Sequence, residues 1–219
     1  MPRLLFEKTG NSVWISHLDL MRLFQRAFKR ANLPLKHTQG FNPRPSVSIA
    51  LPLSVGVQSM CELLDFELEG QNIQNEDICH MLNEKLIDGV SVLKVYDDGR
   101  KIRDLAYLAC TIDLAYDRGV PDHALEQVEA LFVSESIIVE KKGKNGYVEH
   151  DIRPMIRQLT VSAADEHRIR LEALICCQNP SLNPSLLVSA VERYLPQCTP
   201  DDVAIKRIEI YDNNQEVFR

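Results

Sequence analysis

The order in which strand-like and helix-like segments follow one another sets the narrowest limits on the fold of this chain. Up to residue 96, the hydrophobic patterns run as strand, helix, two strands, helix and strand. This order is the split βαβ, or ferredoxin-like, motif, in which antiparallel strands carry two helices on one face. The same order returns in the second half without a close repeat of the sequence. We therefore predict an α+β protein made of two ferredoxin-like βαββαβ halves.

A polar, turn-rich stretch separates the two halves. The residues Asp97-Asp98-Gly99-Arg100-Lys101 have the composition of an exposed linker. We predict an N-terminal ferredoxin-like domain over 1–98 and a C-terminal one over 104–219. Each is close to the ~100 residues that can bury a self-sufficient core.

The clearest element of the first half is a helix over 16–31. Ser16 and Asp19 have the spacing of a capping box, and apolar residues recur at helical spacing from Leu20 to Ala31. The other patterns of this half predict strands at 46–51, 61–68 and 90–96, and a helix at 76–86. Residues 2–13 predict a strand with a turn signal, Thr9-Gly10-Asn11, inside it.

The second half has a weaker pattern in its middle. A hairpin is expected from 137–141 and 147–150, around Gly143-Lys144-Asn145-Gly146. Residues 152–159 fit either a strand or a helical turn, because Pro154 weakens a strand. The remaining segments predict strands at 106–115, 167–176 and 203–211, and helices at 121–132 and 184–194.

Composition indicates a soluble globular protein, since 45% of the residues are hydrophobic and 26% are charged. No apolar run reaches the ~18–20 residues of a membrane span, and the N-terminus lacks a signal-peptide pattern. We therefore predict a cytoplasmic protein without a membrane partner. The six cysteines form no CxxC pair, which indicates buried free thiols. No nucleotide-binding loop or metal-ligand spacing stands out, so we expect neither a metal nor a cofactor.

Charge is distributed unevenly along the chain. The formal net charge is −6, yet the first 60 residues contain eight Lys or Arg and only two acids. A basic segment on an acidic chain indicates an anionic partner that docks at one place. Attraction between the two parts of the chain is the alternative explanation.

The basic residues gather on one face of the first helix and in the loop after it. Arg22, Arg26, Lys29 and Arg30 have the spacing of a single helix face. Positive charge beside a stackable ring suits single-stranded nucleic acid or a phosphorylated ligand. A solvated helix face, and a Phe41 that plugs the core, are the alternatives. The candidate nucleic-acid-binding residues are Arg22, Arg26, Lys29, Arg30, Lys36, His37, Phe41, Asn42 and Arg44.

His17 is a weak candidate for a catalytic residue. It lies in the first turn of the predicted helix, next to basic residues. A neutral imidazole there could act as a general base on the 2′-hydroxyl of RNA. A capping or packing role for His17 is the alternative, and Asp19 either caps the helix or orients a neighbouring side chain.

Four segments carry a resemblance to a known family. These are Ile15-Ser16-His17-Leu18-Asp19-Leu20-Met21-Arg22, Arg26-Ala27-Phe28-Lys29-Arg30-Ala31, Gly40-Phe41-Asn42-Pro43-Arg44-Pro45 and Leu51-Pro52-Leu53-Ser54-Val55-Gly56. Over about residues 3–70 the chain resembles the radical SAM-linked protein family, a domain of unknown function, although Arg44 stands where members often have histidine. The resemblance implies a partner radical SAM protein with a cobalamin-type domain, in the context of RNA or the ribosome. The chain lacks the CxxxCxxC cluster motif, so the resemblance implies an accessory role.

Three functions follow as hypotheses. The first is an accessory, RNA-binding or substrate-presenting protein that works with a radical SAM enzyme in RNA or ribosome-related modification. The second is a protein-interaction subunit that docks the radical SAM partner without touching RNA, through an apolar patch beside the basic one. The third is a metal-independent endoribonuclease that uses His17, since the first half is also faintly similar to CRISPR repeat-processing endoribonucleases.

Overall fold

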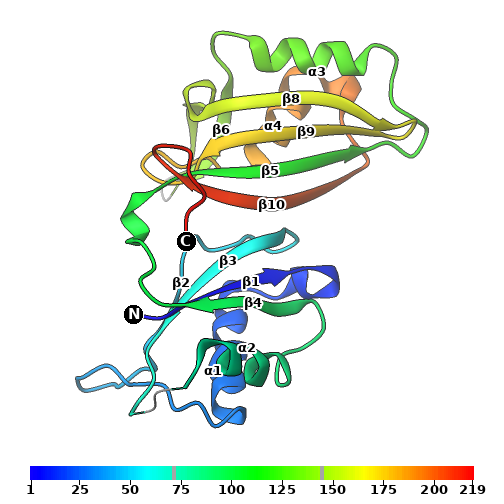
Figure 1. The fold of residues 1–219 in the computed structure, drawn as a ribbon. Helices are drawn as coiled ribbons and strands as arrows, with labels where there is room; N and C mark the ends of the chain where they lie inside the picture. Colours follow the sequence, from blue (N-terminus) through cyan, green and yellow to red (C-terminus); the bar gives the residue numbers. More distant parts are fainter. Residues whose placement is uncertain (71–72, 144–145) are drawn as a thin grey trace. The chain divides into compact units, whose positions relative to one another are not determined.

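The protein is described by a computed structural model that covers residues 1–70, 73–143 and 146–219. The chain divides into two compact units. The first unit is Met1–Ile102 together with Arg219, and the second is Arg103–Phe218. Figure 1 shows that each unit is a sheet with two helices against it.

The first unit has the strand order of a ferredoxin-like fold. Strand β1 lies between β4 and β3, β2 pairs with β3, and all of these pairs are antiparallel. The resulting order β4-β1-β3-β2 places the two halves of the split βαβ motif side by side and confirms the prediction. The elements are β1 (Arg3–Lys8), α1 (His17–Arg30), β2 (Val47–Ile49), β3 (Gln58–Phe66), α2 (Asn75–Asn83) and β4 (Val90–Tyr96).

Aromatic side chains of α1 fill the core of the first unit. The Phe24 and Phe6 rings meet edge to face with centroids 4.7 Å apart, and the Phe28 and Phe66 centroids are 5.0 Å apart. All four side chains are fully buried. This packing leaves the opposite face of α1, which carries the cations, exposed.

The predicted capping box begins α1. The Ser16 hydroxyl accepts a hydrogen bond from the Asp19 amide (3.2 Å) and donates one to the Asp19 carboxylate (2.7 Å). The expected strand over 2–13 is wrong beyond Lys8, because the chain turns there into a 3-10 helix at Gly10–Trp14.

The second unit repeats the strand order of the first. Its sheet runs β10-β5-β9-β8, and every neighbouring pair is antiparallel. Both units therefore have the predicted ferredoxin-like topology. The elements of this sheet and its helices are β5 (Leu105–Ala115), α3 (Ala124–Val133), β8 (Ile156–Asp165), β9 (Arg168–Cys176), α4 (Ser185–Tyr194) and β10 (Asp202–Asp212).

A hairpin is inserted between α3 and β8. Strands β6 (Ile138–Gly143) and β7 (Gly146–Asp151) pair with each other as a separate two-stranded sheet, as predicted. The expected turn residues Lys144 and Asn145 lie outside the described residues. The undecided segment 152–159 enters β8 at Ile156, after a 3-10 turn that contains Pro154.

Asp151 fastens the base of this hairpin. Its carboxylate accepts hydrogen bonds from the Ile137 amide (2.9 Å), the Arg153 amide (3.0 Å) and the Ser136 hydroxyl (3.0 Å). These bonds, above all that from Ile137, lower the pKa of Asp151.

The six cysteines are free, and five of them are buried, which confirms the prediction of free thiols. None of the helices in the described part of the chain is long and apolar enough to cross a membrane. Within the same residues, no group of three or more His, Cys, Asp or Glu side chains could hold a metal ion.

Candidate nucleic-acid interface

The basic residues predicted to form the interface are all exposed, whereas Arg3 and Lys8 of the same unit are buried. The exposed residues lie on two segments, the outer face of α1 and the loop that connects α1 to β2. The exposed cations are Arg22, Arg26, Lys29 and Arg30 on the helix, and Lys36 and Arg44 at the loop.

Three of these cations already have partners within the first unit. Arg22 Nη1 lies 2.9 Å from Asp19 Oδ1, and Lys36 Nζ lies 3.0 Å from Glu67 Oε2. Arg30 Nη2 donates to the Lys85 carbonyl at 3.0 Å. The pKa of Asp19 is lowered first by the Ser16 hydroxyl and then by Arg22. Exposed pairs of this kind are weak and break readily when an anion competes.

The other three cations, Arg26, Lys29 and Arg44, have no hydrogen bond or ion pair of their side chains among the described residues. Arg26 and Lys29 are three positions apart on α1, so their charges lie on neighbouring turns of one face. Like charges at this spacing repel each other, and a bound anion would relieve the repulsion.

The loop between α1 and β2 is closed at its base and open at its tip. His37 and Pro45 form a bridge, the Thr38 amide donates to the Arg44 carbonyl (2.8 Å), and the Arg44 amide donates to the Thr38 hydroxyl (3.0 Å). Figure 1 shows this loop projecting away from the rest of the first unit. These hydrogen bonds hold the two ends of the loop together and so set the direction in which its tip points.

Phe41 stands at the tip of this loop and is fully exposed, at 105% of its reference surface. The alternative in which Phe41 plugs the core is therefore wrong. His37 and Asn42 are exposed as well. A bare phenyl ring beside cations is the arrangement that stacks on an unpaired base.

His17 offers a poor acid–base site. The residue is half-buried, and its Nδ1 atom is buried without a hydrogen-bond partner among the described residues. A general base is normally oriented by a second group at hydrogen-bond distance. No such group is found for His17 within the described part of the chain.

The sequence hypothesis of an apolar patch beside the basic face named no residues, and three exposed apolar side chains near the start of α1 were not singled out. Trp14 is 71% exposed, Leu18 66% and Val55 53%. The signal was available, because Trp14 is the only tryptophan and lies two residues before the helix cap. We define Trp14, Leu18 and Val55 as the apolar cluster.

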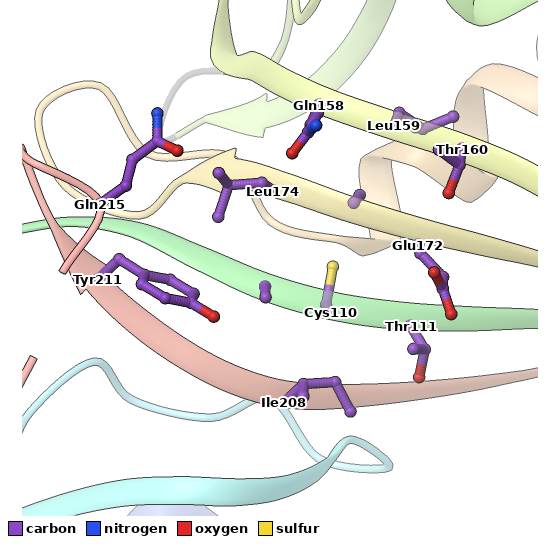
Figure 2. Close-up of a pocket in the computed structure, with 12 residues that line it drawn as sticks. Cys110, Thr111, Gln158, Leu159, Thr160, Glu172, Leu174, Ile208, Tyr211 and Gln215 are labelled. Atoms are coloured by element: carbon purple, nitrogen blue, oxygen red, sulfur yellow. The ribbon is translucent and has the colours of Figure 1, made fainter. Parts of the chain in front are cut away.

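The second unit carries a groove that the sequence did not reveal. Figure 2 shows it on the sheet, with side chains from β5, β8, β9 and β10 around it. Its volume is about 550 Å³, and Glu172 is the only charged residue among those that line it. The lining residues are Ala109, Cys110, Thr111, Gln158, Leu159, Thr160, Glu172, Ala173, Leu174, Ile208, Tyr211 and Gln215.

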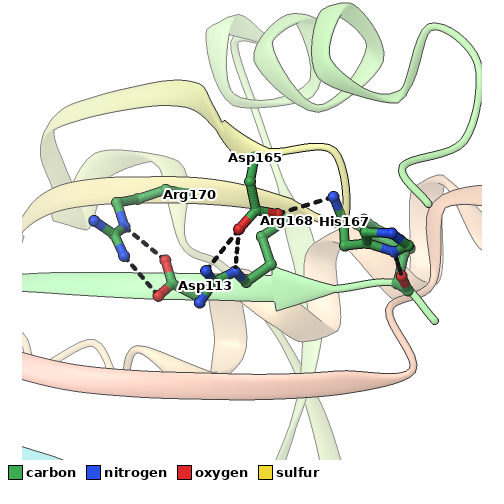
Figure 3. A network of polar contacts seen from close by, with 6 residues as sticks. Asp113, Asp165, His167, Arg168 and Arg170 are labelled. Carbon is green, nitrogen blue, oxygen red and sulfur yellow. Dashed lines mark hydrogen bonds and ion pairs between the residues drawn. The ribbon is translucent and has the colours of Figure 1, made fainter.

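Two arginines on the sheet of the second unit, Arg168 and Arg170, are paired with acids. Arg170 binds Asp113 through two nitrogens at 2.6 and 2.8 Å, and Arg168 Nη2 lies 2.6 Å from Asp165 (Figure 3). The His167 ring contacts the Tyr116 carbonyl at 2.9 Å. The charges of Arg168 and Arg170 are therefore balanced locally.

Comparisons with known proteins identify a family and a fold. A family model described as "Uncharacterized protein conserved in bacteria (DUF2344)" matches residues 2–184. No curated protein matches the chain.

Two solved structures match over most of this chain, and the first of them supports the fold. In "Crystal Structure of a Cbf5-Nop10-Gar1 Complex", a chain has a TM-score of 0.50 at 10% identity, over 95% of this chain and 48% of that one. A chain of "Crystal structure of the archaeal box H/ACA sRNP Nop10-Cbf5 complex" has a TM-score of 0.44 at 8% identity, over 94% and 46%. The protein spans about half the length of these chains, and at such identity the likeness concerns the fold alone.

Proposed function

The chain belongs to the bacterial family DUF2344, and on this premise we propose that it is an accessory protein whose first unit binds single-stranded RNA. The binding surface consists of the outer face of α1 and the loop from His37 to Pro45. One observation carries the proposal: Arg26, Lys29 and Arg44 are exposed without a paired acid among the described residues, and a fully exposed Phe41 lies three residues before Arg44.

The chemistry of this surface suits RNA better than a compact anion. The three cations are spread over a helix face and a loop, whereas a phosphate-binding site gathers its donors around one point. An extended strand with a phosphate on every nucleotide can reach all of them in turn. The ring of Phe41 then stacks on a base, which needs no particular sequence.

We predict that the variant Arg26→Glu/Lys29→Glu/Arg44→Glu binds single-stranded RNA about 10- to 100-fold more weakly than the native protein, because three phosphate contacts become repulsive. The measurement is fluorescence anisotropy of a labelled 12-nucleotide oligouridylate, titrated at several salt concentrations. The slope of log K against log salt should fall by about 2, since each contact to a single strand contributes about 0.7.

A matched control reverses the same number of charges elsewhere. Lys94, Lys101 and Arg118 are exposed cations outside α1 and the loop. Their triple replacement by glutamate should change affinity far less than the interface variant does. Equal losses in both variants would show that net charge alone attracts the RNA, and no binding by the native protein would refute the proposed function.

The enzymatic partner that we propose is a radical SAM protein, for which the chain would present RNA. The support is the sequence resemblance over residues 3–70. Mixing the purified protein with a cobalamin-type radical SAM protein from the same bacterium should give a complex that co-elutes in size-exclusion chromatography. Separate elution at concentrations of tens of micromolar would refute this partnership and leave the RNA-binding proposal standing.

A further inference from the structure

An exposed tryptophan stands directly before the basic helix. Trp14 ends the 3-10 turn Gly10–Trp14, and the cap of α1 follows at Ser16. Its side chain is 71% exposed. An indole ring left in water is a large apolar surface, and such surfaces on folded proteins commonly mark contact sites.

A buried lysine fixes the backbone on both sides of Trp14. Lys8 Nζ donates to the Val13 carbonyl at 3.1 Å and to the Ile15 carbonyl at 2.8 Å. Lys8 itself is only 1% exposed. Because the carbonyls before and after Trp14 are both held by one ammonium group, the ring is presented from a rigid support.

Gly56 holds the same turn from another side. Its amide donates to the Val13 carbonyl at 2.9 Å. Gly56 has φ +85°, and a Cβ atom there would lie 3.4 Å from Cζ3 of Trp14. Glycine therefore supplies the left-handed conformation of this turn, and its Cα lies close to the indole ring.

The exposed stripe that starts near Trp14 continues as cations. Leu18, Arg22, Arg26 and Lys29 follow at i, i+4, i+8 and i+11, which places them along one side of α1. Over these eleven residues the helix rises by about 16 Å. An aromatic ring at the start of a row of cations is the usual composition of a path for single-stranded nucleic acid.

A protein partner fits this cluster less well. A stable protein interface covers about 800 Å² on each partner, which takes some 20 residues or more. The apolar cluster has three exposed side chains, and the next residues along the stripe are charged. Its size and surroundings therefore favour one or two stacked bases.

We infer that Trp14 is a base-stacking residue and that single-stranded RNA runs along α1 from Trp14 toward the loop that carries Phe41. This inference rests on the proposed function and adds a second stacking position and a direction to it. Arg22 lies between Trp14 and Arg26 along this stripe. In the complex, its ion pair with Asp19 is replaced by an ion pair with a phosphate of the RNA.

The single tryptophan makes the inference directly measurable. Oligouridylate of 12 nucleotides should quench the emission of Trp14, with the same midpoint as the anisotropy titration of the same RNA. Inorganic polyphosphate of equal charge has no bases and should compete for the cations without comparable quenching. Trp14→Ala should weaken RNA binding about 10-fold, whereas Trp14→Phe, which retains a ring, should stay within about 3-fold of the native affinity.

Tyr147→Ala provides the matched control, because Tyr147 is an exposed aromatic residue of the second unit (70%). The inference is overturned if RNA binds by anisotropy while Trp14 emission does not change and Trp14→Ala binds normally. In that case the proposed function stands, and the apolar cluster has a different occupant. Absence of binding by anisotropy overturns the proposed function and this inference together. Circular dichroism verifies the fold of each variant. The quenching measurement uses the native protein alone, so it does not depend on the folding of any variant.

Discussion

Replacing Phe24 by alanine should lower the free energy of unfolding of the first unit by about 3–5 kcal/mol. Phe24 is fully buried, and its ring meets Phe6 edge to face across the interface between α1 and the sheet. The substitution removes this aromatic contact and leaves a cavity that the rigid β1 and α1 backbones cannot close.

Urea unfolding followed by tryptophan emission measures this change. Trp14 is the only tryptophan and belongs to the first unit, so its emission reports on that unit. Phe41→Ala is the matched control, because the same substitution at a fully exposed ring should cost less than about 0.5 kcal/mol. Similar losses for Phe24 and Phe41 would contradict the assignment of one ring to the core and the other to the exposed surface.

Replacing Lys8 by methionine should destabilise the first unit by about 3 kcal/mol. Methionine has nearly the same volume but cannot donate hydrogen bonds to the Val13 and Ile15 carbonyls. Glu62, which is 1% exposed, also loses the charge of Lys8. The pKa of Lys8 is lowered by burial, and Glu62 opposes this by raising it.

The measurement is urea unfolding followed by circular dichroism, because the emission of Trp14 itself changes when its support is removed. Lys29→Met is the matched control, since Lys29 is exposed on α1 and makes no ion pair among the described residues. A loss below about 1 kcal/mol in Lys8→Met would show that water or another donor replaces the ammonium group.

Local signals predicted the elements that are determined locally. Ser16 and Asp19 form the capping box that their spacing indicated, and the apolar stripe from Leu20 to Ala31 packs against the sheet. The topology of both units followed from the order of strands and helices, because few arrangements accommodate a split βαβ motif.

The second half shows where local reasoning fails. Strand β8 is exposed along most of its length, so its residues do not give the apolar alternation of a half-buried strand. Its pairing with β9 depends on residues that come later in the chain, such as Leu171 opposite Val161. The groove around Glu172 likewise gathers residues from four strands, and no spacing in the sequence reports such a neighbourhood.

At the candidate interface, sequence found the charges but not their partners or the tryptophan. Exposure of Arg26 and Arg44 could be expected from composition, whereas the pairing of Lys36 with Glu67 required the sheet. Trp14 was missed because the strand was predicted to continue to Val13 after the turn signal at Thr9-Gly10-Asn11. The strand ends at Lys8, whose side chain bonds to the turn that follows.

The strand order also determines when each unit can complete its sheet during synthesis. In each unit the first strand made, β1 or β5, occupies the middle of its sheet, and one of its two neighbours is the last strand made. Leu5 of β1 can pair with Lys94 only after β4 has been synthesised, and Tyr107 of β5 can pair with Tyr211 only after β10 has been synthesised. At a translation rate of 5–20 residues per second, synthesis of β10 ends roughly 5–25 seconds after synthesis of β4. The face of α1 and the loop that we propose to bind RNA can therefore form while the second unit is still being synthesised.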